Sequence, residues 1–123
     1  MRTDRRNRSV CITLAFSVLL IVVHSASAHA ILVGSSPPSK GLVRGPDVSV
    51  RLRFNVRVDQ QRSRLTLIRP DSSSQSLVIA KQTSPDMLTA QATALVAGEY
   101  RIRWQVLASD GHITGGEILF TVE

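Results

Sequence analysis

The sequence predicts an all-β fold, a small antiparallel sandwich. Two stretches alternate apolar and polar side chains with the two-residue period of a β-strand, Val48–Phe54 and Tyr100–Val106. Shorter apolar runs are separated by turn-forming residues at the spacing of sandwich strands. No sustained helical periodicity occurs after residue 28. The chain has 123 residues, of which 43% are hydrophobic, so it supplies one core and excludes a large multidomain enzyme.

Residues 1–28 carry the three parts of a secretory signal peptide. Four arginines precede a largely apolar run at 10–23, and Ala26–Ala28 offers the small residues that signal peptidase accepts. The apolar run is shorter than the roughly 20 residues of a membrane-spanning helix, which favours a cleaved leader over an uncleaved N-terminal anchor. We therefore expect a mature domain at 29–123 that begins with His29.

The charge balance and the cysteine count limit the possible partners. The formal net charge is +6 at pH 7, and half of it belongs to the leader, which holds four Arg and one Asp. An exported chain of this balance, without stacking aromatic residues beside its arginines, is not expected to bind nucleic acid. The only cysteine, Cys11, lies in the leader. The mature domain therefore has no disulfide, and a metal site in it must use nitrogen, oxygen or methionine sulfur.

The remaining elements follow in chain order. His29–Val33 is expected to open the first strand, and Ser35–Pro46, which contains several Pro and Gly residues, to be an irregular connection. Beyond Val48–Phe54 we expect four weaker strands bounded by turn residues. These are Arg64–Arg69, Leu77–Lys81, Met87–Leu95 and Glu117–Val122. Two packed sheets of such strands would form an immunoglobulin-like sandwich.

Tyr100 and Trp104 lie on the apolar face of the second strong strand. Leu95–Tyr100 resembles the tyrosine corner of such sandwiches, in which the hydroxyl bonds to backbone just upstream of the strand. We interpret Tyr100 as structural. Trp104 is interpreted as a core anchor, in preference to a solvent-facing residue that stacks on a ligand.

Four arginines occupy the polar faces of the two strong strands. They are Arg51, Arg53, Arg101 and Arg103. The preferred interpretation is a solvated strand face, because exposed charge keeps a sandwich soluble and discourages edge pairing. The alternative is a basic patch for an acidic partner or for anionic lipid head groups.

Only two histidines, His29 and His112, belong to the mature domain. The free α-amine of a terminal His29 and its imidazole Nδ1 can close a chelate ring on one metal ion. In Asp110-Gly111-His112 the outer two residues point to the same side of an extended stretch, and Gly111 permits a tight backbone path. Among first-row divalent ions, copper(II) binds such ligands most tightly and prefers a tetragonal arrangement.

Neither the terminal His29 nor the Asp110-Gly111-His112 sequence is by itself strong evidence for a metal site. Asp-Gly is a common turn pair, so a polar turn with an exposed histidine is the alternative interpretation. The two halves together use every histidine of the mature domain, and each supplies what the other lacks. Nitrogen ligands must be unprotonated to bind, so we expect acid to release the metal from such a site.

Several motifs follow one another along nearly the whole mature domain. They are His29–Leu32, Ser36–Pro38 with Gly41, Val50–Phe54, Gly98–Trp104, Ser109–His112 with Gly115 or Gly116, and Phe120–Val122. In order and spacing this set resembles the CopC-type periplasmic copper-binding proteins. The stretch from Val56 to Thr93 is generic strand sequence and adds nothing to the resemblance.

The resemblance implies an immunoglobulin-like or cupredoxin-like β-sandwich that binds one copper(II) ion through His29, Asp110 and His112. It also implies a periplasmic protein that buffers, carries or delivers copper, with a separate inner-membrane partner of the CopD type. We expect a monomer. No nucleophile with a general base stands out in the sequence, so we expect no enzymatic activity.

The chain departs from the family pattern in two places. Phe54-Asn55 is followed by Val56, where family members often have an acidic residue, so a second carboxylate near the copper is missing. Met87 is the only methionine of the mature domain. A single soft ligand does not select copper(I), so we expect no thioether site for that ion.

Two rival functions stay open. The N-terminal histidine chelate with a second histidine also resembles the copper site of polysaccharide monooxygenases, but this short chain places its aromatic residues on predicted inward faces. The other rival is a metal-free sandwich that acts in adhesion or assembly. Oxidation of a polysaccharide would favour the first, and failure to bind copper would favour the second.

Overall fold

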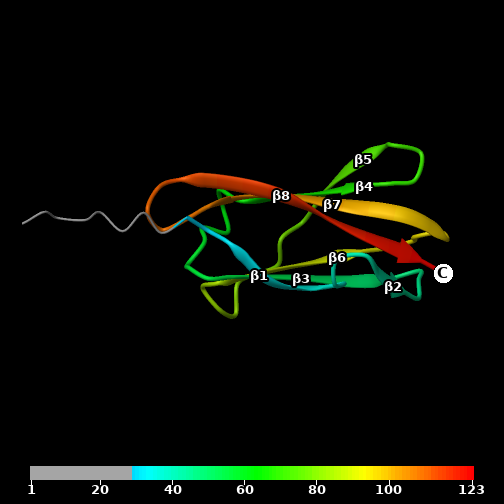
Figure 1. Cartoon of the computed structure of the whole chain (residues 1–123), viewed down its shortest axis with the longest axis horizontal. Coiled ribbons are helices and arrows are strands. Elements are labelled where there is room, and N and C mark those ends of the chain that lie inside the picture. The colour runs from blue at the N-terminus through cyan, green and yellow to red at the C-terminus, as the bar shows by residue number, and fades with distance from the viewer. Residues whose placement is uncertain (1–28) are drawn as a thin grey trace, which may run out of the picture.

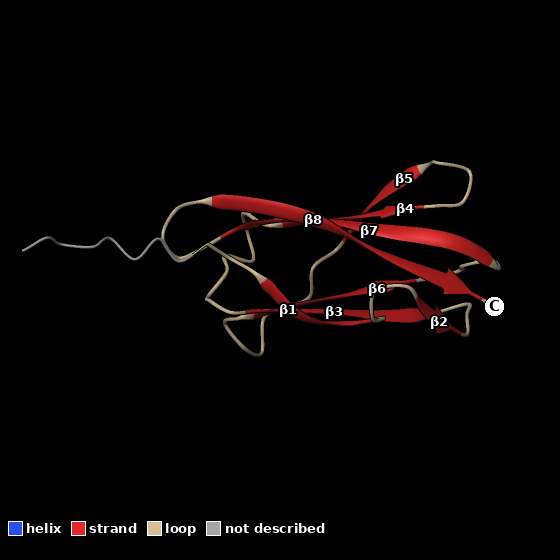
Figure 2. Ribbon diagram, viewed as in Figure 1, coloured by secondary structure: helices blue, strands red, loops and turns tan. Residues whose placement is uncertain are grey.

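Within residues 29–123, eight strands form two β-sheets that pack face to face (Figures 1 and 2). The computed structural model describes residues 29–123, so the expected signal peptide lies outside the described residues. The strands are β1 (Leu32–Ser36), β2 (Gly41–Val43), β3 (Val48–Phe54), β4 (Arg64–Ile68), β5 (Ser74–Leu77), β6 (Met87–Ala92), β7 (Gly98–Leu107) and β8 (Ile113–Val122). The all-β sandwich is confirmed. Within 29–123, no helix has the length and apolarity needed to cross a membrane.

The smaller sheet has the strand order β1-β3-β6, and the larger has the order β2-β8-β7-β4-β5. Neighbouring strands run antiparallel except at one edge, where Gly41–Val43 pairs in parallel with Phe120–Val122. β7 and β8 pair along their whole length, from Gly98 opposite Val122 to Leu107 opposite Ile113. Their connecting loop therefore lies at one end of the sandwich (Figure 1).

The core fills the space between the sheets. Buried and exposed residues alternate along β3 and through the middle of β7, as the sequence pattern predicts. The rings of Tyr100 and Phe120 stack at a centroid distance of 5.5 Å, and Phe54 meets Trp104 edge to face at 5.2 Å. Tyr100 and Phe120 lie opposite each other within the larger sheet, whereas Phe54 and Trp104 come from different sheets. Full burial of an apolar side chain contributes roughly 1.5–3 kcal/mol, so the Phe54–Trp104 pair helps to fix how the sheets pack.

Both predictions for the aromatic residues of β7 are confirmed. The Tyr100 hydroxyl donates to the Val96 carbonyl oxygen (2.8 Å) and accepts from the Val96 N–H (3.1 Å). Trp104 is 7% exposed and covers Gly116, where an added Cβ would lie 2.7 Å from the indole. The solvent-facing alternative for Trp104 is therefore wrong.

The N-terminal strand limits differ from the prediction. β1 begins at Leu32 rather than at His29, and it ends inside the stretch that was expected to be irregular. That stretch also holds β2, which is only three residues long. β2 forms because its backbone meets β8, and the contact is extended by the Lys40 N–H, which donates to the Leu119 carbonyl oxygen (2.6 Å). A long-range pairing of this kind leaves no local pattern in the sequence.

Three later strands also have other limits than expected. β5 lies at Ser74–Leu77 instead of Leu77–Lys81. The Arg69 N–H donates to the Ser73 carbonyl oxygen and closes a tight turn, so the polar residues that follow the turn pair directly with β4. β6 stops at Ala92 because Ala94 has a φ of 56°, outside the extended region. β8 starts before the predicted Glu117, since its two glycines pair with β7 despite their low strand propensity.

The four arginines of the two strong strands are exposed, as predicted. Arg51 and Arg53 lie on the smaller sheet, whereas the two arginines of β7 lie on the larger one. The outer faces of packed sheets point away from each other, so the four side chains do not form one basic patch. Arg53 pairs with Asp86 at 3.5 Å, and both arginines of β7 pair with Glu117. The solvated-face interpretation fits this arrangement.

Candidate metal centre

The loop between β7 and β8 is shaped by its own backbone. The Ala108 N–H donates to the His112 carbonyl oxygen (2.9 Å), and the Gly111 N–H donates to the Ala108 carbonyl oxygen (3.0 Å). Gly111 has a φ of 86°, in a region that glycine enters without the steric cost of a Cβ. The glycine therefore permits the tight path that was predicted for it.

Within this loop, the Asp110 carboxylate contacts both the backbone and the ring of His112. Its Oδ1 accepts from the His112 backbone N–H, and its Oδ2 lies 3.0 Å from His112 Nδ1. The backbone bond, aided by the His112 ring, lowers the pKa of Asp110 from its usual 3.8 against the opposing effect of desolvation. The carboxylate is thus a stable acceptor. With a proton on Nδ1, the His112 ring keeps its Nε2 lone pair for another partner.

The segment that carries His29 is held by residues from distant parts of the chain. Ala30 is buried, and its carbonyl oxygen accepts from Thr114 Oγ1 (3.1 Å). Ile31 makes two hydrogen bonds with Asn55: its N–H donates to Asn55 Oδ1 (2.7 Å), and its carbonyl oxygen accepts from the Asn55 N–H (3.0 Å). The two residues after His29 are therefore anchored to β8 and to the end of β3.

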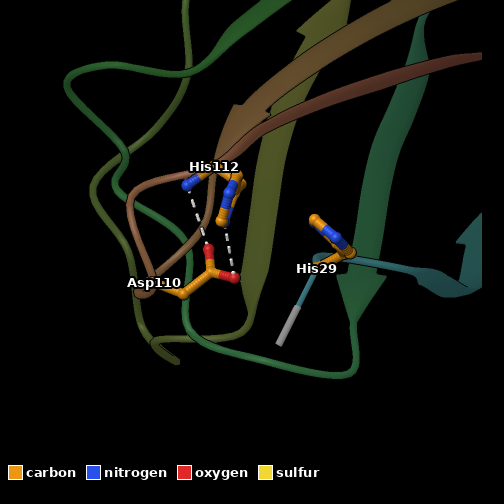
Figure 3. A group of neighbouring side chains, drawn as sticks. All are labelled: His29, Asp110 and His112. Carbon is orange, nitrogen blue, oxygen red and sulfur yellow. Dashed lines mark hydrogen bonds and ion pairs between the residues drawn. The ribbon is translucent and has the colours of Figure 1, made fainter. Parts of the chain in front are cut away.

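His29, Asp110 and His112 meet at one end of the sandwich (Figure 3). Each offers a potential ligand atom, and these atoms lie within 4.8 Å of one another. The two imidazole centroids are also 4.8 Å apart, with the rings inclined at 66°. Figure 3 shows Asp110 and His112 on one loop and His29 across from them, on the segment that leads to β1. The structure thus brings together all three residues that the sequence singled out.

The donor atoms at this centre are nitrogen and oxygen. Two imidazoles and a carboxylate suit divalent first-row metals, and copper(II) has the highest affinity of these for such ligands. All three residues are exposed as whole residues, with the His112 side chain keeping 58% of its accessible surface and the Asp110 side chain 18%. A metal ion here would be reached directly from solvent.

Asn55 and Thr114 were missed by the sequence reasoning. Both position the His29 segment, yet an Asn after a strand and a Thr within one have many roles, so only the folded structure shows these contacts. Val56, where the family resemblance pointed to a carboxylate, is half-buried and packs against the core. It offers no ligand atom.

Comparison with known proteins agrees with this architecture. The model of the CopC domain family matches residues 32–123. The chain belongs to the CopC domain family. Copper resistance protein C of Escherichia coli is 31% identical over 111 residues, which cover 83% of this chain and 87% of the relative. Protein YobA of Escherichia coli strain K12 is 28% identical over 119 residues, or 94% of this chain and 96% of the relative.

Solved CopC structures have the same fold. CopC from Methylosinus trichosporium OB3b superposes with a TM-score of 0.70 at 34% identity, covering 77% of this chain and 94% of that one. PcoC from Escherichia coli, a methionine-rich copper resistance protein, superposes with a TM-score of 0.64 at 27% identity, covering 78% of this chain and 100% of that one. In the present CopC domain Met87 is the only methionine within 29–123, so the methionine-rich character of PcoC is missing.

Proposed function

We propose that this CopC-domain protein is exported and binds one copper(II) ion between His29, Asp110 and His112, in order to buffer, carry or deliver it. The observation that carries the proposal is the meeting of these three side chains from opposite ends of the domain. The names of the copper resistance proteins among its relatives support copper as the metal.

Each ligand has its own task in this proposal. Cleavage before His29 would free its α-amine, which then chelates the ion together with Nδ1. His112 binds through Nε2, because its Nδ1 faces Asp110 Oδ2. Asp110 orients that ring and offers a carboxylate oxygen of its own. Each of the three residues has a potential ligand atom within 4.8 Å of those of the other two, so the side chains would close together around the ion.

An exposed centre suits the transfer of an ion. A ligand from another protein can approach the metal without any opening of the core, because all three residues lie at the surface. We place the protein in the periplasm as a monomer that passes copper to a separate inner-membrane protein of the CopD type. Protons compete for the nitrogen ligands, so acid should release the ion.

A copper-dependent oxidative enzyme is the second candidate, because it would use the same histidine chelate. Against it stands the burial of the aromatic side chains that such an enzyme would use to hold a polysaccharide. Phe54, Tyr100, Trp104 and Phe120 are each at most 7% exposed. We expect the copper-loaded protein to release no oxidised sugar from chitin or cellulose in the presence of ascorbate. Release of such products would favour the enzyme.

The proposal is tested by copper titration of the exported protein. The full sequence is expressed, and mass spectrometry identifies the first residue of the exported form. Calorimetry should show one copper(II) ion per chain, and His112→Ala should lower the affinity more than about 100-fold, beyond the usual loss for a residue that only supports a ligand. Asp71→Asn, in the β4–β5 turn, is the matched control and should bind like the wild type. A first residue other than His29, or copper binding unchanged by His112→Ala, would overturn the proposal.

A further inference from the structure

A surface depression lies at the end of β7 and β8 that is far from the loop of the metal centre. It has a volume of about 730 Å³ and forms where the β4–β5 turn, the start of β7, the end of β8 and the residue before β2 meet. We call it the basic hollow. The lining residues that matter here are Lys40, Arg69, Ser72, Glu99, Arg101 and Leu119. Glu99 pairs with Thr121, at the opposite end of the β7–β8 ladder from the loop of the metal centre.

The lining of the basic hollow has an excess of two positive charges. Lys40, Arg69 and Arg101 face a single carboxylate, that of Glu99. The Lys40 side chain forms no ion pair with any residue of 29–123. Arg69 donates to the neutral side chain of Gln75, and Arg101 has one ion pair, at 3.6 Å. Asp71 also lies near Arg69, whose charge helps to lower the pKa of that carboxyl. Lys40 is therefore the lining cation whose charge the fold leaves without an ion pair.

Two lining residues have a backbone conformation that residues with a Cβ avoid. Lys40 has a φ of 61° and Ser72 a φ of 68°, and only one other non-glycine residue in 29–123 has a positive φ. The Lys40 N–H donates to the Leu119 carbonyl oxygen, and the Ser72 N–H donates to the Arg69 carbonyl oxygen. These bonds fix both residues on the rim. Strained residues of this kind gather at binding sites.

One side of the basic hollow is apolar. Leu119 is 46% exposed there, and Pro70 forms part of the wall. Pro70 packs so closely on Gly98 that a Cβ at Gly98 would lie 2.6 Å from the proline ring. A ligand that fits this lining combines an anionic group with a small carbon skeleton.

We propose that the basic hollow binds a phosphate monoester. The dianion would pair with the ammonium of Lys40, which has no ion pair, and guanidinium groups such as those of Arg69 and Arg101 pair with phosphate oxygens in a fork geometry. Lys40 adds a point charge and Ser72 a hydroxyl donor, while Leu119 contacts the carbon skeleton. The phosphate belongs either to a soluble ester or to the head group of a phosphatidic acid lipid. The site is independent of the proposed copper function.

The experiment uses copper-free, ¹⁵N-labelled protein produced from the full sequence. Glycerol 1-phosphate is titrated in, with glycerol as the uncharged control, and amide shifts should concentrate at Lys40, Ser72 and Leu119. Lys40→Gln and Arg69→Gln should each weaken binding about fivefold, the upper range for one exposed ion pair. The matched control is Arg64→Gln, an exposed β4 arginine outside the hollow, which should bind like the wild type.

Vesicles distinguish the two sources of phosphate. Sedimentation with phosphatidic acid vesicles but not with phosphatidylcholine vesicles, if weakened by Lys40→Gln and not by Arg64→Gln, supports the lipid head group. Saturable binding of glycerol 1-phosphate without sedimentation supports a soluble ester. The proposal is overturned if neither probe binds, or if Arg64→Gln weakens binding as much as Lys40→Gln does, since the attraction would then be spread over the surface.

Discussion

The two halves of the candidate metal centre are organised in different ways. The loop half, Ala108–His112, is closed mainly by hydrogen bonds among its own residues, and its Ser109 N–H also donates to the Arg57 carbonyl oxygen (3.1 Å). The His29 half depends on Ala30 and Ile31, whose partners lie 84 and 24 positions away in the chain. The loop half is therefore held mostly by local bonds and by one contact with the segment after β3, whereas the bonds of the His29 half all join distant parts of the chain.

The loop residues are positioned for metal binding by contacts close in sequence, whereas His29 is brought to them by the packing of the sheets. Hydrogen bonds from Asp110 to the backbone and the ring of His112 hold the two side chains in place, so the loop would lose little conformational freedom when an ion binds. His29 is added to them by the packing of β1 and β3 against β8. We expect substitutions in the His29 half to alter copper affinity without disturbing the loop. Substitutions in the loop should instead change the position or the tautomer of the His112 ring.

The largest effect is expected for His29→Ala. It removes one donor and breaks the chelate between the α-amine and Nδ1, so copper affinity should fall more than about 100-fold and further than with His112→Ala. Because His29 is exposed, the free energy of unfolding should change by less than about 0.5 kcal/mol. Calorimetry and thermal unfolding measure the two quantities. An affinity loss smaller than that of His112→Ala would contradict the chelate.

Asp110→Asn tests the loop half and should lower copper affinity about 10- to 100-fold. An asparagine still accepts from the His112 backbone N–H, but its amide would donate to Nδ1 and leave the ring proton on Nε2, the atom proposed to bind copper. The imidazole ¹⁵N shifts of the copper-free protein should report this change of tautomer. Asp71→Asn is the control. If copper bound more weakly but the tautomer of His112 did not change, Asp110 would act as a copper ligand and would not orient the His112 ring.

The same variant has a pH signature in the copper-free protein. The His112 backbone N–H holds the folded-state pKa of Asp110 below 3.8, so this carboxylate stabilises the fold above that pH. The contribution is lost as the pH falls through the lower, folded-state value. Asp110→Asn should therefore be less stable than the wild type near neutral pH and should approach it in strong acid. A difference that grows on acidification would contradict this sign.

The elements whose residues alternate between apolar and polar side chains could be predicted from the sequence. The strict alternation in β3 and β7 gave the sandwich, and the positions of Tyr100 and Trp104 followed from it. The limits of β2 and β5 could not be predicted, because they depend on pairing with β8 and β4. In the metal centre His29, Asp110 and His112 could be singled out from sequence as candidates, because the two histidines are the only ones in 29–123 and the family resemblance includes all three residues. Asn55 is not distinctive, and its contact with Ile31 spans the fold.

The smallest effect is expected for Asn55→Ala, which tests the anchoring of the His29 half. The Ile31 N–H would lose its acceptor, at a cost of about 1 kcal/mol in the free energy of unfolding. The segment would then be held less firmly, and copper affinity should fall about fivefold, an effect below that of a lost ligand. Hydrogen exchange of the Ile31 amide should accelerate, while that of His112 in the loop should not. Asn55→Asp keeps the acceptor oxygen and should restore slow exchange at Ile31. If Asn55→Ala instead matched His29→Ala in affinity, or accelerated exchange equally in both halves, the two halves would not be organised independently.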